Sequence, residues 1–134
     1  MAVENIKEWM GLLAKKGAAA RLVRGRLGCD CPDSVFEHYR IRIRMEGPAP
    51  MVQLIMGGKL LVWIMDAGDA LSLERTVHEI LEMGLRERDR RVLNRFRLVV
   101  VGKIDPASTD AFARAAESLD PRVHFHVVDT LDDR

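Results

Sequence analysis

The chain contains few cysteines, no long uninterrupted apolar stretch and almost no net charge, and each of these excludes a class of protein. It has only two cysteines in 134 residues, so a framework of disulfides cannot be what stabilises it. Its longest apolar stretch, MVQLIMGGKLLVWIMDA at 51–67, is interrupted by Gly57, Gly58 and Lys59 and falls short of a bilayer span. The formal net charge is +1, from 21 basic and 20 acidic residues, which excludes strong whole-molecule attraction to nucleic acid or to an anionic membrane.

Familiar catalytic and targeting signatures are also missing. Neither G-x-G-x-x-G nor G-x-x-x-x-G-K-S/T occurs, so no standard phosphate-binding glycine loop is present. No Ser, His and Asp arrangement stands in a recognisable local context. The first residues lack the charged, apolar and small-residue zones of a signal peptide. We therefore expect a cytoplasmic protein with reduced cysteines and no membrane association.

The remaining composition, 48% apolar and 31% charged, is typical of a globular protein, and we expect residues 1–134 to form a single domain. Apolar spacing predicts helices at 3–16, from about 69–72 to 91, and at 108–119. It predicts strands at 21–28, 39–45, 52–56, 59–65, 96–104 and 122–129. The predicted fold is therefore α/β, with a five- to six-stranded mixed sheet, a central β-hairpin, a C-terminal βαβ unit and packed helices.

This order of elements resembles the restriction-nuclease-like fold. That family needs an acidic residue two positions before a lysine on a strand, and no Asp/Glu-x-Lys occurs in this sequence. A metal-dependent nuclease of that type is therefore not expected.

The two cysteines, Cys29 and Cys31, are one residue apart, and Pro32 follows directly. Proline and Asp33 favour the first turn of a helix, which would place Cys31 at a helix N-terminus. The N–H groups there stabilise a thiolate and make a cysteine more reactive, although acidic neighbours such as Asp30 oppose this effect. Cys31 is therefore the predicted reactive thiol, with Cys29 as resolving thiol or second ligand.

The segment LGCDCPDSVFEHYR at 27–40 resembles the signature of the TusA-like sulfur-carrier proteins, in which Gly-x-x-Cys-Pro-x-Pro opens a helix. The resemblance implies that Gly28, Cys31 and Pro32 occupy the matching positions and that Cys31 carries persulfide sulfur. Ser34 stands where the family has its second proline, and the alternating YRIRIR stands where the family has a long helix. The likeness is therefore local.

Metal binding is another possible role for the cysteines. Cys29 and Cys31 offer two soft ligands, and His124 and His126 point to the same side of a predicted strand. The four side chains would suit a metal ion or an iron–sulfur cluster, if the fold or a homodimer brings them together. The plain alternative is a pair of buried thiols with no chemical role.

Arginines form a second candidate site. Arg40, Arg42 and Arg44 alternate with apolar residues, so they are predicted to share one face of a strand, and the strand expected at 21–28 would add Arg24 and Arg26. Such a face would hold an anionic cofactor or partner. A solvated outer face explains the same pattern. Aromatic residues do not interleave with the arginines, so nucleic acid is not the expected partner.

Acidic residues follow three predicted strands, in DAGD at 66–69, in GKIDPASTD at 102–110 and at Asp129. The carboxyl ends of parallel strands often bind small molecules or divalent ions, although loops and helix caps explain the same residues.

Together these patterns predict a small cytoplasmic accessory protein that uses its Cys-x-Cys-Pro site for thiol redox, sulfur transfer or metal handling, with another protein as partner. The alternative is a non-catalytic binding module that uses the arginine-rich strand face.

Overall fold

The computed structural model describes residues 2–27, 38–47, 49–67 and 73–131. In chain order the elements are α1 (Ala2–Leu13), α2 (Lys16–Ala20), the π-helix η1 (Arg21–Arg26), β1 (Tyr39–Arg44), β2 (Met51–Met56), β3 (Leu60–Asp66), α3 (Leu73–Arg90), β4 (Arg95–Val101), α4 (Pro106–Leu119) and β5 (Val123–Val128). The predicted helical start at the cysteine pair lies outside the described residues.

The five strands form one mixed sheet in the order β1-β2-β3-β4-β5. β1, β2 and β3 are antiparallel neighbours, whereas β3, β4 and β5 run parallel. The hairpin between β2 and β3 turns at Gly57 and Gly58, whose φ angles of 60° and 64° suit glycine far better than other residues. The predicted α/β fold with a mixed sheet and a C-terminal βαβ unit is thus confirmed.

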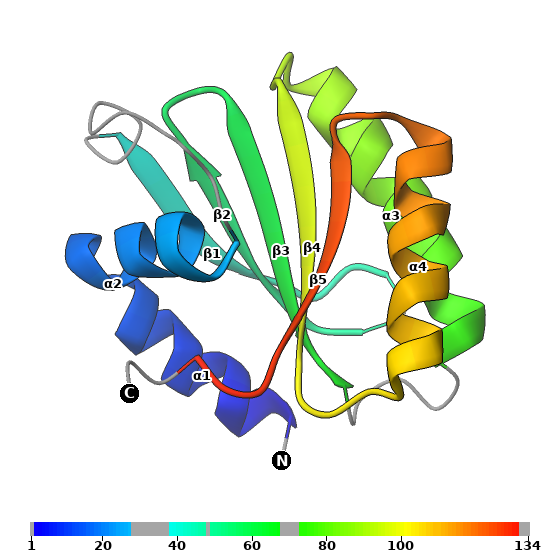
Figure 1. Ribbon diagram of the computed structural model, residues 1–134. Coiled ribbons are helices and arrows are strands. Elements are labelled where there is room, and N and C mark those ends of the chain that lie inside the picture. The colour runs from blue at the N-terminus through cyan, green and yellow to red at the C-terminus, as the bar shows by residue number, and fades with distance from the viewer. Residues whose placement is uncertain (1, 28–37, 48, 68–72, 132–134) are drawn as a thin grey trace.

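Helices cover both faces of the sheet (Figure 1). α3 and α4 each connect parallel strands and pack on the same face, around a core that includes Trp63, Phe96 and Phe112. α1 and the helical segment α2–η1 pack on the opposite face, where Ile6, Leu13 and their neighbours meet the other side chains of the strands. Alternation along each strand therefore directs successive side chains toward opposite faces of the sheet, and the buried apolar ones form two cores.

The prediction of a strand at 21–28 was wrong, because this segment is helical. Leu27 N donates to Leu22 O at 3.0 Å, the i→i+5 bond of a π-helix. Residues Ala19, Leu22, Val23 and Leu27 are buried at helical spacing, and the alanines before them favour a helix. Arg24 is therefore not on the sheet, and the predicted five-arginine sheet face does not form.

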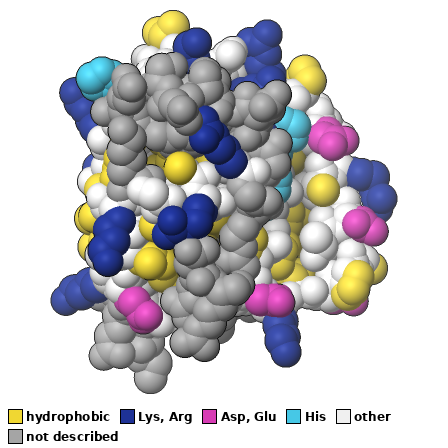
Figure 2. Space-filling view, turned by 60° about the vertical axis from the view of Figure 1, so that its left-hand side comes forward, with side chains coloured by type: hydrophobic (Ala, Val, Ile, Leu, Met, Phe, Trp, Pro, Cys, Tyr) yellow, Lys and Arg dark blue, Asp and Glu magenta, His cyan; other side chains and the backbone are white. Residues whose placement is uncertain are grey.

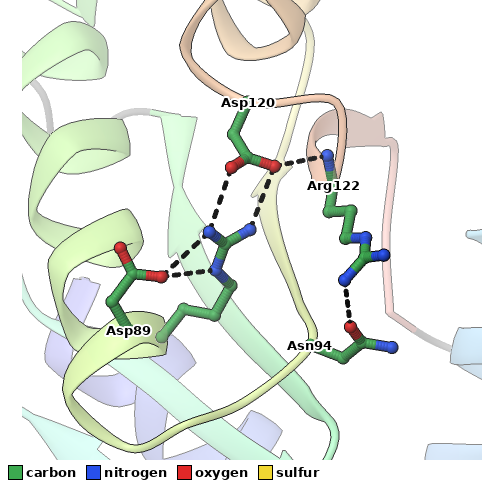
Figure 3. Close-up of polar contacts among 5 residues, drawn as sticks. Asp89, Asn94, Asp120 and Arg122 are labelled. Atoms are coloured by element: carbon green, nitrogen blue, oxygen red, sulfur yellow. Dashed lines mark hydrogen bonds and ion pairs between the residues drawn. The ribbon is translucent and has the colours of Figure 1, made fainter.

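The turns that precede β4 and β5 are joined by a polar network around Arg88, near the end of α3 (Figure 3). The Arg88 guanidinium donates two hydrogen bonds to the Asp120 carboxylate, at 3.1 and 3.0 Å, and also contacts Asp89. Asp120 in turn accepts from Arg122 N at 2.7 Å, and Arg122 Nη1 donates to Asn94 Oδ1. This network is structural, since it ties the end of α3 to the turn between α4 and β5.

Within the described ranges, no helix combines the length and the apolar character needed to cross a bilayer.

Candidate functional site

The three arginines predicted to share one face lie on β1, and they differ in how far they are exposed. Arg40 and Arg42 are exposed, whereas Arg44 is only 9% exposed. The Arg44 guanidinium carbon lies 4.4 Å from the centre of the Trp63 ring, in a cation–π contact. Two arginines therefore point outward, and the third is anchored in the edge of the core.

The anchor for Arg44 depends on a buried polar pair. Trp63 Nε1 donates to Gln53 Oε1 at 2.9 Å, across neighbouring strands, and both side chains are almost fully buried. This bond satisfies the indole N–H while leaving the ring face free for Arg44. Alternation along the strand predicted that the three arginines share a face, but it could not predict the contact of Arg44 with Trp63, which lies two strands away.

β1 is also an edge strand, because it pairs only with β2 in the described sheet. Gly57 N donates to His38 O at 2.7 Å, so His38 and Gly57 form a hydrogen-bonded pair in the antiparallel register. Such pairs alternate with non-bonded pairs along the ladder. The N–H and C=O groups of Tyr39, Ile41 and Ile43 therefore point away from β2, toward the outer edge.

Among the described residues, the acidic side chain that contacts these arginines is Glu46. Arg42 Nη2 lies 3.6 Å from Glu46 Oε1, with both side chains well exposed. A backbone hydrogen bond of Glu46 itself, together with the charges of Arg42 and Arg44, lowers the pKa of the Glu46 carboxyl below its usual value. Figure 2 brings this side of the molecule forward, and Lys and Arg side chains are spread over it more widely than Asp and Glu.

His124 and His126 lie on one face of β5, as strand alternation predicts. Their ring centroids are 6.4 Å apart. They project from the face that α1 covers, whereas Arg40 and Arg42 project from the face that α3 covers. The sheet therefore separates the histidines from the arginine face.

His126 contacts an arginine that sequence reasoning did not single out. Arg97 Nη1 lies 2.8 Å from His126 Nε2 and donates to Leu27 O at 2.9 Å. Burial, followed by the charge of Arg97, lowers the pKa of His126 to about 4, so its imidazole is neutral at physiological pH. The available signal in the sequence was the position of Arg97 between apolar residues in the strand RFRLVVV.

The predicted roles of Cys29 and Cys31 fall on residues outside the described ranges. Two of the acidic residues that follow the strands have structural partners: Asp66 accepts from Asn5 Nδ2 at 2.6 Å, and Asp105 caps α4 through Ser108 N at 3.2 Å. Asp69 lies outside the described residues. Among the described side chains, no group of three or more His, Cys, Asp or Glu is placed to hold a metal ion.

No protein-family model and no curated protein matches this chain.

Proposed function

We propose that the protein is a non-catalytic binding module that receives an extended acidic segment of a partner protein along the outer edge of β1. One observation carries this proposal: the edge strand combines outward backbone groups with two exposed arginines on a single face. Extended peptides bind such edges as an added strand, in which main-chain hydrogen bonds give affinity and alternate side chains give specificity.

The register defines the sequence that such a segment needs. Arg40 and Arg42 are two residues apart on the strand, so their Cα atoms are separated by about 6.7 Å. Side chains of an added strand repeat at the same interval and lie about 5 Å from their cross-strand neighbours at Cβ. Asp or Glu at every second position therefore matches both arginines, with apolar residues in between facing Ile41 and Ile43.

Arg44 stabilises this arrangement from within. Because its guanidinium packs on Trp63, it holds the end of β1 against the core while adding positive charge below the two exposed arginines. The pair between Arg42 and Glu46 is exposed and therefore weak, about 0.2–1 kcal/mol, so a better placed carboxylate displaces it easily.

Two synthetic peptides test the proposal, one alternating Glu with Val and one alternating Lys with Val. We expect the full-length protein to bind the Glu peptide and not the Lys peptide, with an affinity that falls as salt rises. The double variant Arg40→Glu/Arg42→Glu should weaken binding of the Glu peptide by about tenfold or more, since two attractions become repulsions. Arg114→Glu, on the exposed surface of α4, is the matched control.

Backbone pairing is tested from the peptide side, where folding of the protein is unaffected. N-methylation of the Glu peptide at alternate residues removes the donors on one edge, and shifting the methyl groups by one residue removes those on the other. One pattern should abolish binding and the other should preserve it. Equal affinity of both patterns, or undiminished binding to the Arg40→Glu/Arg42→Glu variant, would show that β1 is not the docking edge.

A second candidate function remains the predicted chemistry of the cysteine pair. It is supported by the carbonyl of Leu27, which accepts from Arg97 beside His126, while Cys29 follows only two positions later in the sequence. Protein purified anaerobically should then carry stoichiometric metal, sulfide or added sulfur mass, and Cys31→Ser should lose it. Equal loading of the Cys31→Ser variant would contradict this role.

A further inference from the structure

Arg97 is a buried cation on the sheet face opposite the arginines of β1. Its side chain is 5% exposed, and it projects from β4 between the helical segment that ends at Leu27 and the edge strand β5. In the register of the two strands, Arg97 is paired with His124, and His126 follows on the same face. An arginine buried to this degree needs compensating partners.

The partners of Arg97 are neutral acceptors. Its Nη1 donates to Leu27 O and to the Nε2 lone pair of His126, while Nε is buried with no hydrogen-bond partner. Leu27 ends a helical segment, whose carboxyl end supplies at most about half a negative charge. No ion pair joins Arg97 to a carboxylate within the ranges that the structure describes.

Neighbouring groups add positive charge. Arg95 lies exposed on the same face of β4, and its charge helps to lower the pKa of Arg97, after the larger effect of burial. Burial, Arg97 and Arg95 also lower the pKa of His124, while the exposed carboxylate of Glu117 acts in the opposite direction. Among the described residues, Glu117 is the carboxylate that acts on this cluster, against the two arginines, so the described part of the cluster has an excess of positive charge.

We propose that Arg97, Arg95, His124 and His126 form a binding site for a small tetrahedral oxyanion, of which inorganic phosphate and a phosphomonoester group are the chemical type. A guanidinium fork matches the oxygens of such a group, and the unpaired Nε of Arg97 supplies a donor that none of the described residues uses. The two imidazoles are half-buried on the same face as Arg97 and add N–H donors beside it.

The same contacts favour an anion over a metal ion. A metal bound at His126 Nε2 would have to replace Arg97 at 2.8 Å and would stand beside a guanidinium cation. An oxyanion, in contrast, leaves the bond between Arg97 and His126 in place and neutralises the charge. This site is independent of the docking edge, because it lies on the other face of the sheet.

Titration with inorganic phosphate, followed by the ring resonances of the histidines, tests the site. The four histidines of the chain provide an internal comparison, since His78 lies exposed on α3, on the far face of the sheet. We expect phosphate to shift the signals of His124 and His126 in a saturable way and to leave His78 unchanged. At a phosphate concentration ten times the Kd, the Tm should rise by about 5 °C.

Variants separate binding from folding. Arg95→Gln removes an exposed charge and should weaken phosphate binding about two- to fivefold, whereas Arg114→Gln on α4 should leave it unchanged. Arg97→Gln should abolish the saturable shifts; if this variant does not fold, Arg95→Gln remains decisive. Equal shifts at all histidines, no shift at any, or full affinity in Arg95→Gln would overturn the proposal. These outcomes leave peptide binding at β1 untouched.

Discussion

Gly84 lies in the middle of α3, at a position where the packing against β4 leaves no space for a side chain. A Cβ atom built at Gly84 would lie 2.1 Å from Cε2 and Cζ of Phe96 and 2.7 Å from Cδ2. Carbon atoms in contact are normally separated by about 3.5 Å or more, so Gly84→Ala requires a movement of about 1.4 Å. Gly84 thus allows α3 to approach β4 closely.

The ring of Phe96 has no room to give way. It is fully buried and meets Trp63 edge to face, at a centroid distance of 5.1 Å and an interplanar angle of 77°. Overpacking of this kind costs about 3 kcal/mol at its upper range, while alanine gains about 1 kcal/mol of helix propensity over glycine. We therefore expect Gly84→Ala to lower the free energy of unfolding by about 2 kcal/mol, with a fall in Tm of about 7 °C.

Gly11 provides the matched control, because it lies exposed in α1 with no atom within 4 Å of an added Cβ. Gly11→Ala should raise the free energy of unfolding by about 0.5–1 kcal/mol, since only the propensity term remains. Chemical denaturation of the two variants measures both changes, and the double variant Gly84→Ala/Phe96→Leu should recover part of the loss. A Gly84→Ala protein as stable as the wild type would refute the close approach of α3 to β4.

Three further predictions follow from buried polar groups. Arg88→Met should lower the free energy of unfolding, measured by urea denaturation, by about 1–3 kcal/mol, because the side chain of Arg88 is 9% exposed and Asp120 would lose two hydrogen bonds. Arg86→Met, on the exposed side of α3, should change it by less than about 0.5 kcal/mol, and equal effects of the two variants would contradict a structural role of the Arg88 network. Trp63→Phe should lower the free energy of unfolding by about 1–3 kcal/mol more than Trp9→Phe does, because it leaves the buried side-chain carbonyl of Gln53 without its donor; calorimetry of both variants measures the difference. The pKa of His126 falls to about 4 when the protein folds, so neutral His126 contributes fully to stability above about pH 6.5, and roughly 2–3 kcal/mol of the free energy of unfolding is lost as the pH falls toward 4. His126→Gln should flatten the plot of unfolding free energy against pH in this range, and an unchanged plot would show that His126 is not buried beside Arg97.

The spacing of apolar residues predicted secondary structure correctly where a segment followed a single period, either that of a strand or that of a helix. The strict alternation of YRIRIR predicted β1, and the Gly57–Gly58 turn predicted the hairpin between β2 and β3. The segment at 21–28 was mistaken for a strand because its arginines also alternate, while the buried positions follow a helical repeat that begins at Ala19. The parallel pairing of β3 with β4 also escaped prediction, since both strands are apolar on nearly every residue and show no local sign of direction.

The candidate site was only partly accessible from the sequence. Alternation placed Arg40 and Arg42 on one face, but the packing of Arg44 on Trp63 depends on strand order, which is a property of the whole sheet. The contact between Arg97 and His126 likewise joins residues 29 positions apart. Local patterns identify such residues, whereas only the fold shows which of them meet.

Hydrogen exchange at single amides of β1 tests the docking edge most directly. The register leaves the N–H groups of Ile41 and Ile43 outward, while those of Arg40 and Arg42 bond to β2. In the free protein the first two should exchange quickly and the second two slowly; with the Glu–Val peptide bound, all four should be protected. Unchanged fast exchange at Ile41 and Ile43 in the presence of saturating peptide would contradict strand addition at β1.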